Sequence, residues 1–313
     1  MDFQRFKPHL PWITLVVLVA AVGAFDDTFL KPASLLSLMG DIVPLFVMAL
    51  GLTFAIYIGG IDLSAQSMAS LITVVASLYL APLGIWVAAL CILIGFGLGM
   101  VSGYVTTRLL VPSFISSLAV GGIAFSLARY LSGQRALNMD AAQRDSVFGW
   151  MIGKSWGIPH ELFLSTVLLA LAVFVERRTT LGRVLKAVGA GEPAAAVSGI
   201  NVARYKILAF ALSGALAAIA GLMFAVKHSG GAPTIANGFL LPAIVAVLVG
   251  GTPLTGGVGG VLNTAIGTMI VAVIRASMLY FEIDATQQQM VFGLVLIAAI
   301  ALTIDRAKLR TVK

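Results

Sequence analysis

The stretch Gly59-Gly60-Ile61-Asp62-Leu63 separates two long apolar segments by a backbone break that carries one carboxylate. Inside a bilayer, backbone groups freed from a helix and ionisable side chains are tolerated only where protein or a water-filled path receives them. Soluble domains rarely place such a break between two long apolar runs. The stretch therefore predicts membrane-spanning helices interrupted near one membrane face, and it makes Asp62 a candidate functional residue.

The composition outward from this stretch points to the same class of protein. Of the 313 residues, 59% are apolar and only 11% are charged, and the mean hydropathy is +1.03. Soluble domains carry roughly 25% charged residues. We expect an all-α polytopic membrane protein that forms a single domain over residues 1–313. The lone cysteine, Cys91, excludes an intrachain disulfide and is expected to be a small buried side chain.

Hydropathy predicts about ten membrane-spanning helices. They cover residues 10–25, 40–59, 63–81, 84–107, 113–132, 162–175, 205–226, 239–251, 258–280 and 286–304. The first has the basic flank and apolar core of a signal peptide, but the many further spans favour a retained helix. The eighth is too short to cross comfortably and has glycines on both sides. This predicts a short or broken helix near 239–251 that lines a cavity.

The distribution of charge predicts the orientation. With the N-terminus inside, most of the 20 basic residues fall in cytoplasmic segments, whereas basic and acidic residues balance on the other side. Both termini are then cytoplasmic, residues 133–161 form an extracytoplasmic loop and residues 177–204 a cytoplasmic loop. The net charge of +7 is read as a topology signal and not as a nucleic-acid interface, because no exposed aromatics interleave with the basic residues.

The two long loops differ in kind. The outer loop contains Trp150, Trp156 and Gly157-Ile158-Pro159, which predict a short helix or hairpin resting on the membrane surface. Interfacial anchoring by the tryptophans is favoured, with substrate contact as the alternative.

The inner loop contains an amphipathic segment. Its apolar residues follow the i, i+3, i+4, i+7 spacing of one helix face, and these are Leu181, Val184, Leu185 and Val188. Two interpretations remain open: an interfacial helix on the membrane, or a helix that enters a groove on a cytoplasmic partner. Arg183 and Lys186 lie off this face and belong either to the docking surface or to a solvated basic face.

Enzyme chemistry finds no support in the sequence. The glycine-rich segment 250–260 lacks the Gly-Lys-Ser/Thr ending of a phosphate-binding loop. The three histidines, His9, His160 and His228, are far apart, so neither a metal site nor a hydrolytic triad is expected. We predict that the chain is not an enzyme and that it holds no cofactor or metal.

Ionisable residues within the spans are scarce. Only Asp41 and Asp62 come near a span interior, and a charge at the bilayer centre costs about 2.5–3.5 kcal/mol even on lenient scales. Free energy for transport is therefore expected to enter elsewhere, and the cytoplasmic loop is the available entry point. Gly95, Gly99 and Gly103 recur at four-residue spacing, which predicts a close approach of helix backbones.

Several motifs carry a family resemblance. In chain order they are Gly51-Leu52-Thr53-Phe54, Gly59-Gly60-Ile61-Asp62-Leu63-Ser64, Val111-Pro112-Ser113-Phe114-Ile115, Leu181-Gly182-Arg183, Ser198-Gly199-Ile200 and the glycine-rich segment. Together they resemble the sugar-importing permeases of bacterial ATP-binding-cassette systems, the branch that includes ribose, xylose, arabinose and galactoside permeases.

The resemblance implies a dimeric permease in the bacterial inner membrane. Such a permease receives a small sugar of the pentose or hexose class from an extracytoplasmic sugar-binding protein. It is opened by cytoplasmic ATPase subunits, which bind the ATP and magnesium. A nucleic-acid partner is not expected.

The resemblance also implies two sets of site residues. The translocation path or helix break would use Thr53, Phe54, Gly59, Gly60, Asp62, Ser64, Phe114, Gly250, Gly251 and Thr252. Coupling to the ATPase would use Leu181, Gly182, Arg183, Lys186, Gly189, Glu192, Ser198 and Gly199, with the region from Val184 to Gly199 as the coupling helix.

The chain departs from the family pattern at three places. Ala65-Gln66-Ser67 stands where Val-Gly-Ser is usual, Ala190-Gly191-Glu192 where Gly-Gly-Asn is usual, and Phe239-Leu240-Leu241-Pro242 where Glu-Leu-Asp-Ala is usual. The last change removes two acidic groups beside the glycine-rich segment. This motivates the hypothesis of a heterodimer with a second permease, with a homodimer as the alternative.

Two further questions stay open at this level. Asp62 either caps the following helix, by accepting a hydrogen bond from an amide such as that of Ser64 or Ala65, or lines the transport path. The alternative function is a carrier driven by an ion gradient and independent of any ATPase.

Overall fold

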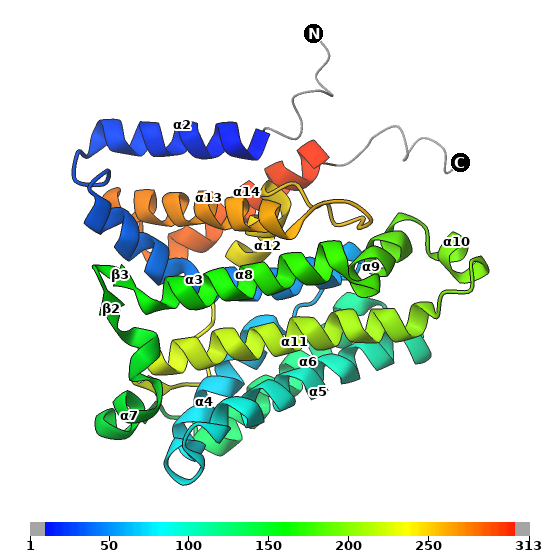
Figure 1. Cartoon of the computed structure of the whole chain (residues 1–313), viewed down its shortest axis with the longest axis horizontal. Helices are drawn as coiled ribbons and strands as arrows, with labels where there is room; N and C mark the ends of the chain where they lie inside the picture. The colour runs from blue at the N-terminus through cyan, green and yellow to red at the C-terminus, as the bar shows by residue number, and fades with distance from the viewer. Residues whose placement is uncertain (1–9, 304–313) are drawn as a thin grey trace.

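The computed structural model describes residues 10–303 as a bundle of helices that run in broadly similar directions, with their connections gathered at two ends (Figure 1). The helices are α2 (Leu10–Phe25), α3 (Pro32–Tyr57), α4 (Ala65–Leu83), α5 (Trp86–Arg108), α6 (Ser113–Ser132), α7 (Ala141–Ile152), α8 (His160–Arg178), α9 (Thr180–Ala190), α10 (Glu192–Val197), α11 (Val202–Lys227), α12 (Leu240–Val249), α13 (Val261–Tyr280) and α14 (Ala285–Thr303).

Each of the ten apolar stretches found in the sequence corresponds to a helix. Six of these, α3, α4, α5, α6, α11 and α13, are long and apolar enough to cross a membrane. Three shorter apolar helices fall at α2, at α12 and within α14. The chain is thus a multi-pass membrane protein, and a total of ten crossings stays a prediction. The second span starts earlier than expected, because α3 begins at Pro32, a residue favoured in the first turn of a helix.

The centre of the bundle is formed by α3, α4 and α11, which supply most of its buried apolar side chains. Helix α11 lies directly against α5, as the glycine spacing predicted. A side-chain carbon at Gly99 would lie 2.2 Å from the carbonyl oxygen of Phe210, so only glycine permits this approach. The expected backbone contact is confirmed.

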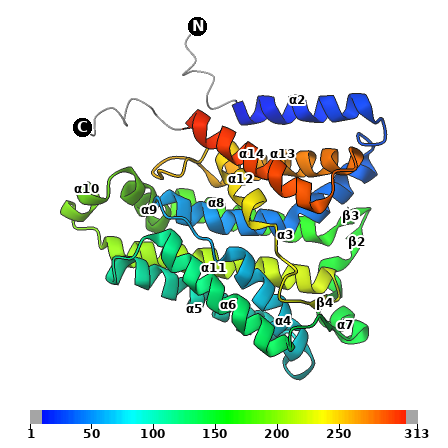
Figure 2. The same ribbon diagram turned by 180° about the vertical axis from the view of Figure 1, so that it is seen from behind.

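A second group of helices covers one side of α3. Helix α13 packs between α2 and α12, and α14 packs on α12 (Figure 2). Helix α12 has only 10 residues, which confirms the short helix near 239–251. Every residue from Pro242 to Leu248 is buried. Helix α12 therefore sits within the core, and the expectation that it lines a cavity is not met along this stretch, because neighbouring helices cover it.

The connections separate into two ends (Figure 1). One end carries α9 and α10, and the first turn of α2 and the last turn of α14 lie toward it. The other carries α7 and two small sheets: β1 (Leu137–Asn138) pairs antiparallel with β4 (Gly230–Gly231), and β2 (Lys154–Ser155) with β3 (Ile158–Pro159). The outer loop thus forms both a helix and a hairpin. Which membrane face each end occupies stays a prediction.

Candidate functional site

The break after α3 is a tight reversal of the backbone. Gly59 has φ +70°, a conformation that glycine adopts without strain. Its amide donates to the carbonyl of Ile56 (2.9 Å), and the amide of Gly60 donates to the carbonyl of Ala55 (3.0 Å). The last carbonyls of α3 are thereby satisfied, as a buried helix end requires.

The extended residues that follow are held by the first turns of α6. The amide of Ile61 donates to Ser113 Oγ (3.1 Å), and that of Leu63 to Ser117 Oγ (3.0 Å). Ser117 Oγ in turn donates to the carbonyl of Ile61 (3.1 Å). These side chains replace the hydrogen bonds that a continuous helix would have supplied, so the break is a defined structure.

Asp62 is buried, at 1% exposure, and both of its carboxylate oxygens have partners. Oδ1 accepts from the Ser64 amide (2.9 Å) and from Ser64 Oγ (2.5 Å). Oδ2 accepts from Ser213 Oγ of α11 (2.6 Å). The Ser64 amide is the contact that the capping alternative expected, although the helix itself begins one residue later, at Ala65. The bond to Ser213 adds an attachment to α11.

The other residues predicted for the path on α3 and α6 lie in different environments. Thr53 is buried, and its hydroxyl pairs with that of Thr264 on α13 (2.7 Å). Phe54 is buried edge-on against Tyr57, with 6.0 Å between ring centroids. Phe114 points away from the protein and is 48% exposed. The structure therefore does not gather these three around one cavity.

A pocket of about 290 Å³ opens beside the break. Gly59 and Gly60 line it together with Ser113 and Phe210, among others. Of the predicted path residues, only these two glycines face this pocket.

The glycine-rich segment between α12 and α13 lies directly against the break. Gly250 ends α12, and the buried Thr252 accepts a hydrogen bond from the Gly260 amide through Oγ1 (3.4 Å). The amide of Gly257 donates to the carbonyl of Tyr57, the last residue of α3 (2.9 Å). Two interruptions of the bundle that are far apart in the sequence therefore meet at one place.

Helix α9 forms as the inner loop predicted, and Thr179 caps its start by accepting from the Gly182 amide (3.4 Å). Its apolar face is turned toward its own chain, since Leu185 and Val188 are buried at 0% and 1% exposure. For Leu185 and Val188 the membrane-surface and partner-groove interpretations are wrong, whereas Leu181 and Val184 are only partly buried. The periodicity was right, but the surface that covers the face is the rest of this chain.

The exposed side of α9 and α10 is small and mixed in character. Arg183 and Ala187 of α9 face outward, and Val197 at the end of α10 is 91% exposed. Ser198 and Gly199 continue this surface, while the exposed Glu192 pairs with Lys206 at the start of α11 (2.5 Å). We call the exposed residues 183, 187, 194 and 196–199 the outer face of α9–α10.

Lys186 of α9 is not part of this outer face. Its Nζ is 2.5 Å from Glu176 Oε1 of α8, and it also donates to the carbonyl of Gly259 (2.9 Å). Glu176 is buried, at 7% exposure, and was not identified from the sequence as a candidate site residue. The available signal was its position as an acidic residue at the end of an apolar stretch beside Arg177-Arg178.

A second buried carboxylate lies at the other end of α8. Glu161 Oε2 is 3.3 Å from Lys227 Nζ of α11, and the same Nζ is 2.8 Å from Asp41 Oδ1 of α3. Both ends of α8 are thus tied to neighbouring helices by ion pairs.

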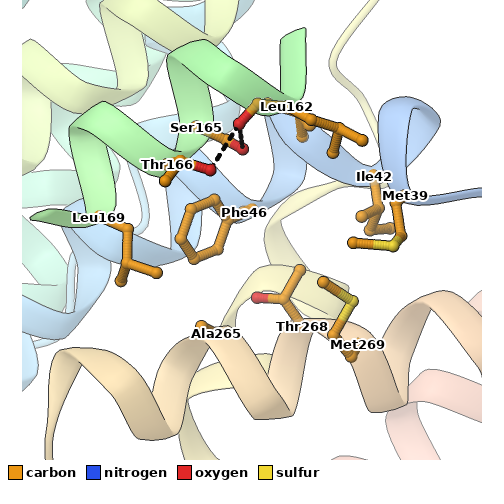
Figure 3. A pocket seen from close by; sticks show the side chains of 11 residues that line it. Met39, Ile42, Phe46, Leu162, Ser165, Thr166, Leu169, Ala265, Thr268 and Met269 are labelled. Atoms are coloured by element: carbon orange, nitrogen blue, oxygen red, sulfur yellow. Dashed lines mark hydrogen bonds between the residues drawn. The ribbon is translucent and has the colours of Figure 1, made fainter. Parts of the chain in front are cut away.

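A pocket of about 150 Å³ lies between α3, α8 and α13 (Figure 3). The hydroxyls of Ser165 and Thr166 both donate to the carbonyl of Leu162 (2.9 and 2.8 Å), and that of Thr268 donates to Thr264 (2.9 Å). Because these donors are used within their own helices, the pocket presents a mainly apolar wall to any occupant. It is a poor match for a polar solute.

An apolar helical bundle with two packed interruptions and a structured loop pair at one end defines a multi-pass integral membrane protein. Residues 34–300 match the family described as branched-chain amino acid transport system, permease component, and the chain belongs to that family. It is accordingly a transport component and not an enzyme.

Curated relatives are similar to the chain over nearly all of its length. The ribose import permease protein of Haemophilus influenzae is 32% identical over 92% of this chain and 90% of its own. A probable ABC transporter permease protein of Escherichia coli is 30% identical over 95% of this chain and 90% of its own. The xylose transport system permease protein of E. coli is 28% identical over 92% and 91%. No solved structure matches the chain.

Proposed function

We propose that this chain is the permease subunit of an ATP-binding-cassette importer that carries a small sugar, of the pentose or hexose class, across the bacterial inner membrane. An extracytoplasmic binding protein delivers the sugar, and cytoplasmic ATPase subunits drive the cycle. The observation that carries the proposal is the similarity to ribose and xylose permeases, which spans at least 90% of both chains in each comparison.

The outer face of α9–α10 supports the proposed contact with an ATPase. It lies at the end of the bundle toward which the first turn of α2 and the last turn of α14 point (Figure 1). An almost fully exposed valine beside small residues and Arg183 is suited to a protein partner, since buried apolar anchors provide much of the affinity of interfaces. Of the coupling residues expected from the sequence, Arg183, Ser198 and Gly199 fall on this face, whereas Lys186 does not.

Coupling then has a simple thermodynamic form. A partner shifts the balance between inward-open and outward-open states only by the difference in its binding free energy to the two states. An ATPase whose contacts with the outer face of α9–α10 change when it closes on ATP supplies such a difference in binding free energy. The chain itself contributes a gate and no nucleotide chemistry.

The environment of Asp62 argues against coupling to an ion gradient. An ion-coupled carrier needs an acidic group whose occupancy changes during the cycle. Each oxygen of Asp62 already accepts from a serine at hydrogen-bond distance. A carboxylate engaged in this way is suited to holding the break together.

Reconstitution tests the proposal. The chain is placed in liposomes with its ATPase and binding protein, and uptake of radiolabelled pentoses and hexoses is measured with and without ATP. We expect uptake that requires ATP and the binding protein, that vanadate inhibits and that ionophores leave intact. Uptake that survives vanadate but collapses with an ionophore would establish the ion-driven alternative instead.

A further inference from the structure

An ion pair between the buried Glu176 and the partly exposed Lys186 joins α9 to the two interruptions of the bundle. Glu176 uses each carboxylate oxygen for a different partner: Oε1 for Lys186 Nζ of α9 (2.5 Å) and Oε2 for the amide of Val261, the first residue of α13 (3.0 Å). One side chain of α8 therefore holds both α9 and the start of α13.

Lys186 extends the connection. Its Nζ donates to the carbonyl of Gly259 in the glycine-rich segment (2.9 Å) and lies 5.0 Å from the centroid of the Tyr57 ring at the end of α3. A cation at this distance from an aromatic face is attracted to it. We call Tyr57, Glu176, Lys186, Gly259 and Val261 the inner hub.

The backbones around the inner hub are as close as the side chains. A side-chain carbon at Gly189 would lie 1.9 Å from the carbonyl oxygen of Tyr57 and 2.4 Å from the amide of Gly257. Helix α9 therefore rests directly on the end of α3 and on the glycine-rich segment. If α9 is displaced, these two elements must either move with it or lose this contact.

Stability alone does not account for a charged hub. Burying an ion pair costs desolvation free energy, and well-packed apolar residues of similar volume are often as stabilising or more so. Hydrogen bonds and ion pairs depend on orientation, whereas apolar contacts do not. The five donor and acceptor atoms of the hub therefore fix α8, α9 and α13 in one relative arrangement. Helix α9 has its outer face toward solvent, and its Lys186 belongs to the inner hub.

We propose that Glu176 and Lys186 are positioning residues that transmit displacement of α9 to the glycine-rich segment, to α13 and to the break after α3. The inference rests on the proposed ATPase-driven function and assigns the residues through which the drive passes. The ATPase moves α9 from its outer face. The inner hub then carries α13 and the end of α3 along with it, which changes the pocket beside Gly59 and Gly60.

The test uses the assembled importer in liposomes and measures ATP hydrolysed per sugar imported. Lys186→Met and Glu176→Gln should each raise this ratio at least about fivefold, the lower end of typical coupling free energies, while the ATPase still co-purifies. Lys186→Arg keeps the charge and the donors and should restore most of the coupling. Lys227→Met is the matched control, because it removes the ion pair between a lysine and the carboxylate at the opposite end of α8 (3.3 Å) without contacting α9 or the glycine-rich segment.

The double variant Lys186→Met/Glu176→Gln decides whether the two residues act through each other. Residues in one network are not additive, so the double variant should raise the ratio no further than the larger single change. A wild-type ratio in Lys186→Met, or a double effect equal to the product of the single effects, overturns the inner hub. If the wild-type complex itself fails to import sugar with ATP, it is the proposed function that fails.

A second experiment leaves the inner hub unaltered and applies even if the Lys186 and Glu176 variants do not assemble with the ATPase. It measures the distance between α9 and the glycine-rich segment. Spin labels at Thr180→Cys of α9 and Val258→Cys, both exposed positions outside the outer face of α9–α10, are introduced in a Cys91→Ala background. Because the inner hub joins α9 to the glycine-rich segment, the distance between the labels should stay constant between the nucleotide-free and vanadate-trapped states. A separation that changes between the two states contradicts the inference.

Discussion

At the scale of single residues, the molecule concentrates its polar contacts where helices are interrupted. Asp62 joins the start of α4 to α11, and Ser113 and Ser117 of α6 bind the extended residues between α3 and α4. The contacts of Ser113 and Ser117 replace backbone hydrogen bonds that the break removed. In a medium without water, such replacement decides whether an interruption can exist at all.

The first prediction concerns Asp62. In Asp62→Asn, the amide oxygen still accepts from Ser64 and the amide NH2 donates to Ser213 Oγ, so much of the transport should remain. In Asp62→Ala, the Ser64 amide and two hydroxyls lose their acceptor, at about 1–3 kcal/mol for each buried group left unpaired. Thermal unfolding in detergent and sugar uptake should both show the loss in Ala only. An Ala variant as stable and active as Asn would reject both the capping and the path interpretations.

The second prediction uses two glycines of α5. Gly99→Val introduces a side chain where the Phe210 carbonyl leaves only 2.2 Å, and it should destabilise the protein by about 3 kcal/mol or more. Gly97→Ala is the matched control, since nothing lies within 4 Å of the added carbon. Its effect should stay below about 1 kcal/mol. Unfolding temperatures of the two variants in the same detergent give the comparison, and equal values would contradict the packing of α5 on α11.

At the scale of elements, the amphipathic helix α9 shows what a sequence pattern contains and what it lacks. The spacing of Leu185 and Val188 predicted a helix with one apolar face, and that helix is present. The pattern did not say what covers the face, because a membrane, a partner and the rest of the chain all bury apolar side chains alike. Glu176 was missed for a similar reason: its partner Val261 lies 85 residues away, a contact that no local pattern reveals.

The span ranges were the more predictable part of the sequence. Long apolar runs such as the one in α11 leave few alternatives to a helix in a bilayer. The short eighth run at α12 was also recognisable from its length. Its environment was not, because hydropathy does not distinguish a helix that lines a cavity from one that neighbouring helices surround.

The third prediction concerns the outer face of α9–α10. Arg183→Glu and Val197→Glu alter the outer face of α9–α10 and should weaken ATPase binding at least about fivefold, as expected for interface anchors. Co-purification and titration with the isolated ATPase provide the measurement. The charge-matched control is Arg135→Glu, an exposed residue in the loop at the opposite end of the bundle. Binding unchanged by both substitutions would mean that the ATPase docks elsewhere.

At the scale of the whole molecule, α8 links the two ends of the bundle. Glu161 at its first turn pairs with Lys227, and Glu176 near its last turn pairs with Lys186. Asp41 joins the Lys227 pair from α3. The loop structures at one end and α9 at the other are therefore both attached to α8.

The fourth prediction concerns the chain as a component. Purified alone in liposomes, it should neither hydrolyse ATP nor concentrate sugar, whereas the ATPase and the binding protein together should supply both activities. The same preparation addresses the heterodimer hypothesis. Normal transport rates with this chain as the sole permease would reject it, and restoration only by a second permease would support it. Native mass spectrometry of the active complex counts the copies directly.

The burial of α12 has a consequence for how the protein is made. A helix of 10 residues cannot reach across the hydrocarbon core, which requires about 20, and its middle offers no surface for lipid to wet. It can leave the insertion machinery only together with α13, which packs directly against it. Polypeptides that stop shortly after residue 250 should therefore stay exposed to the quality-control proteases of the membrane, while those that continue through Tyr280 should survive.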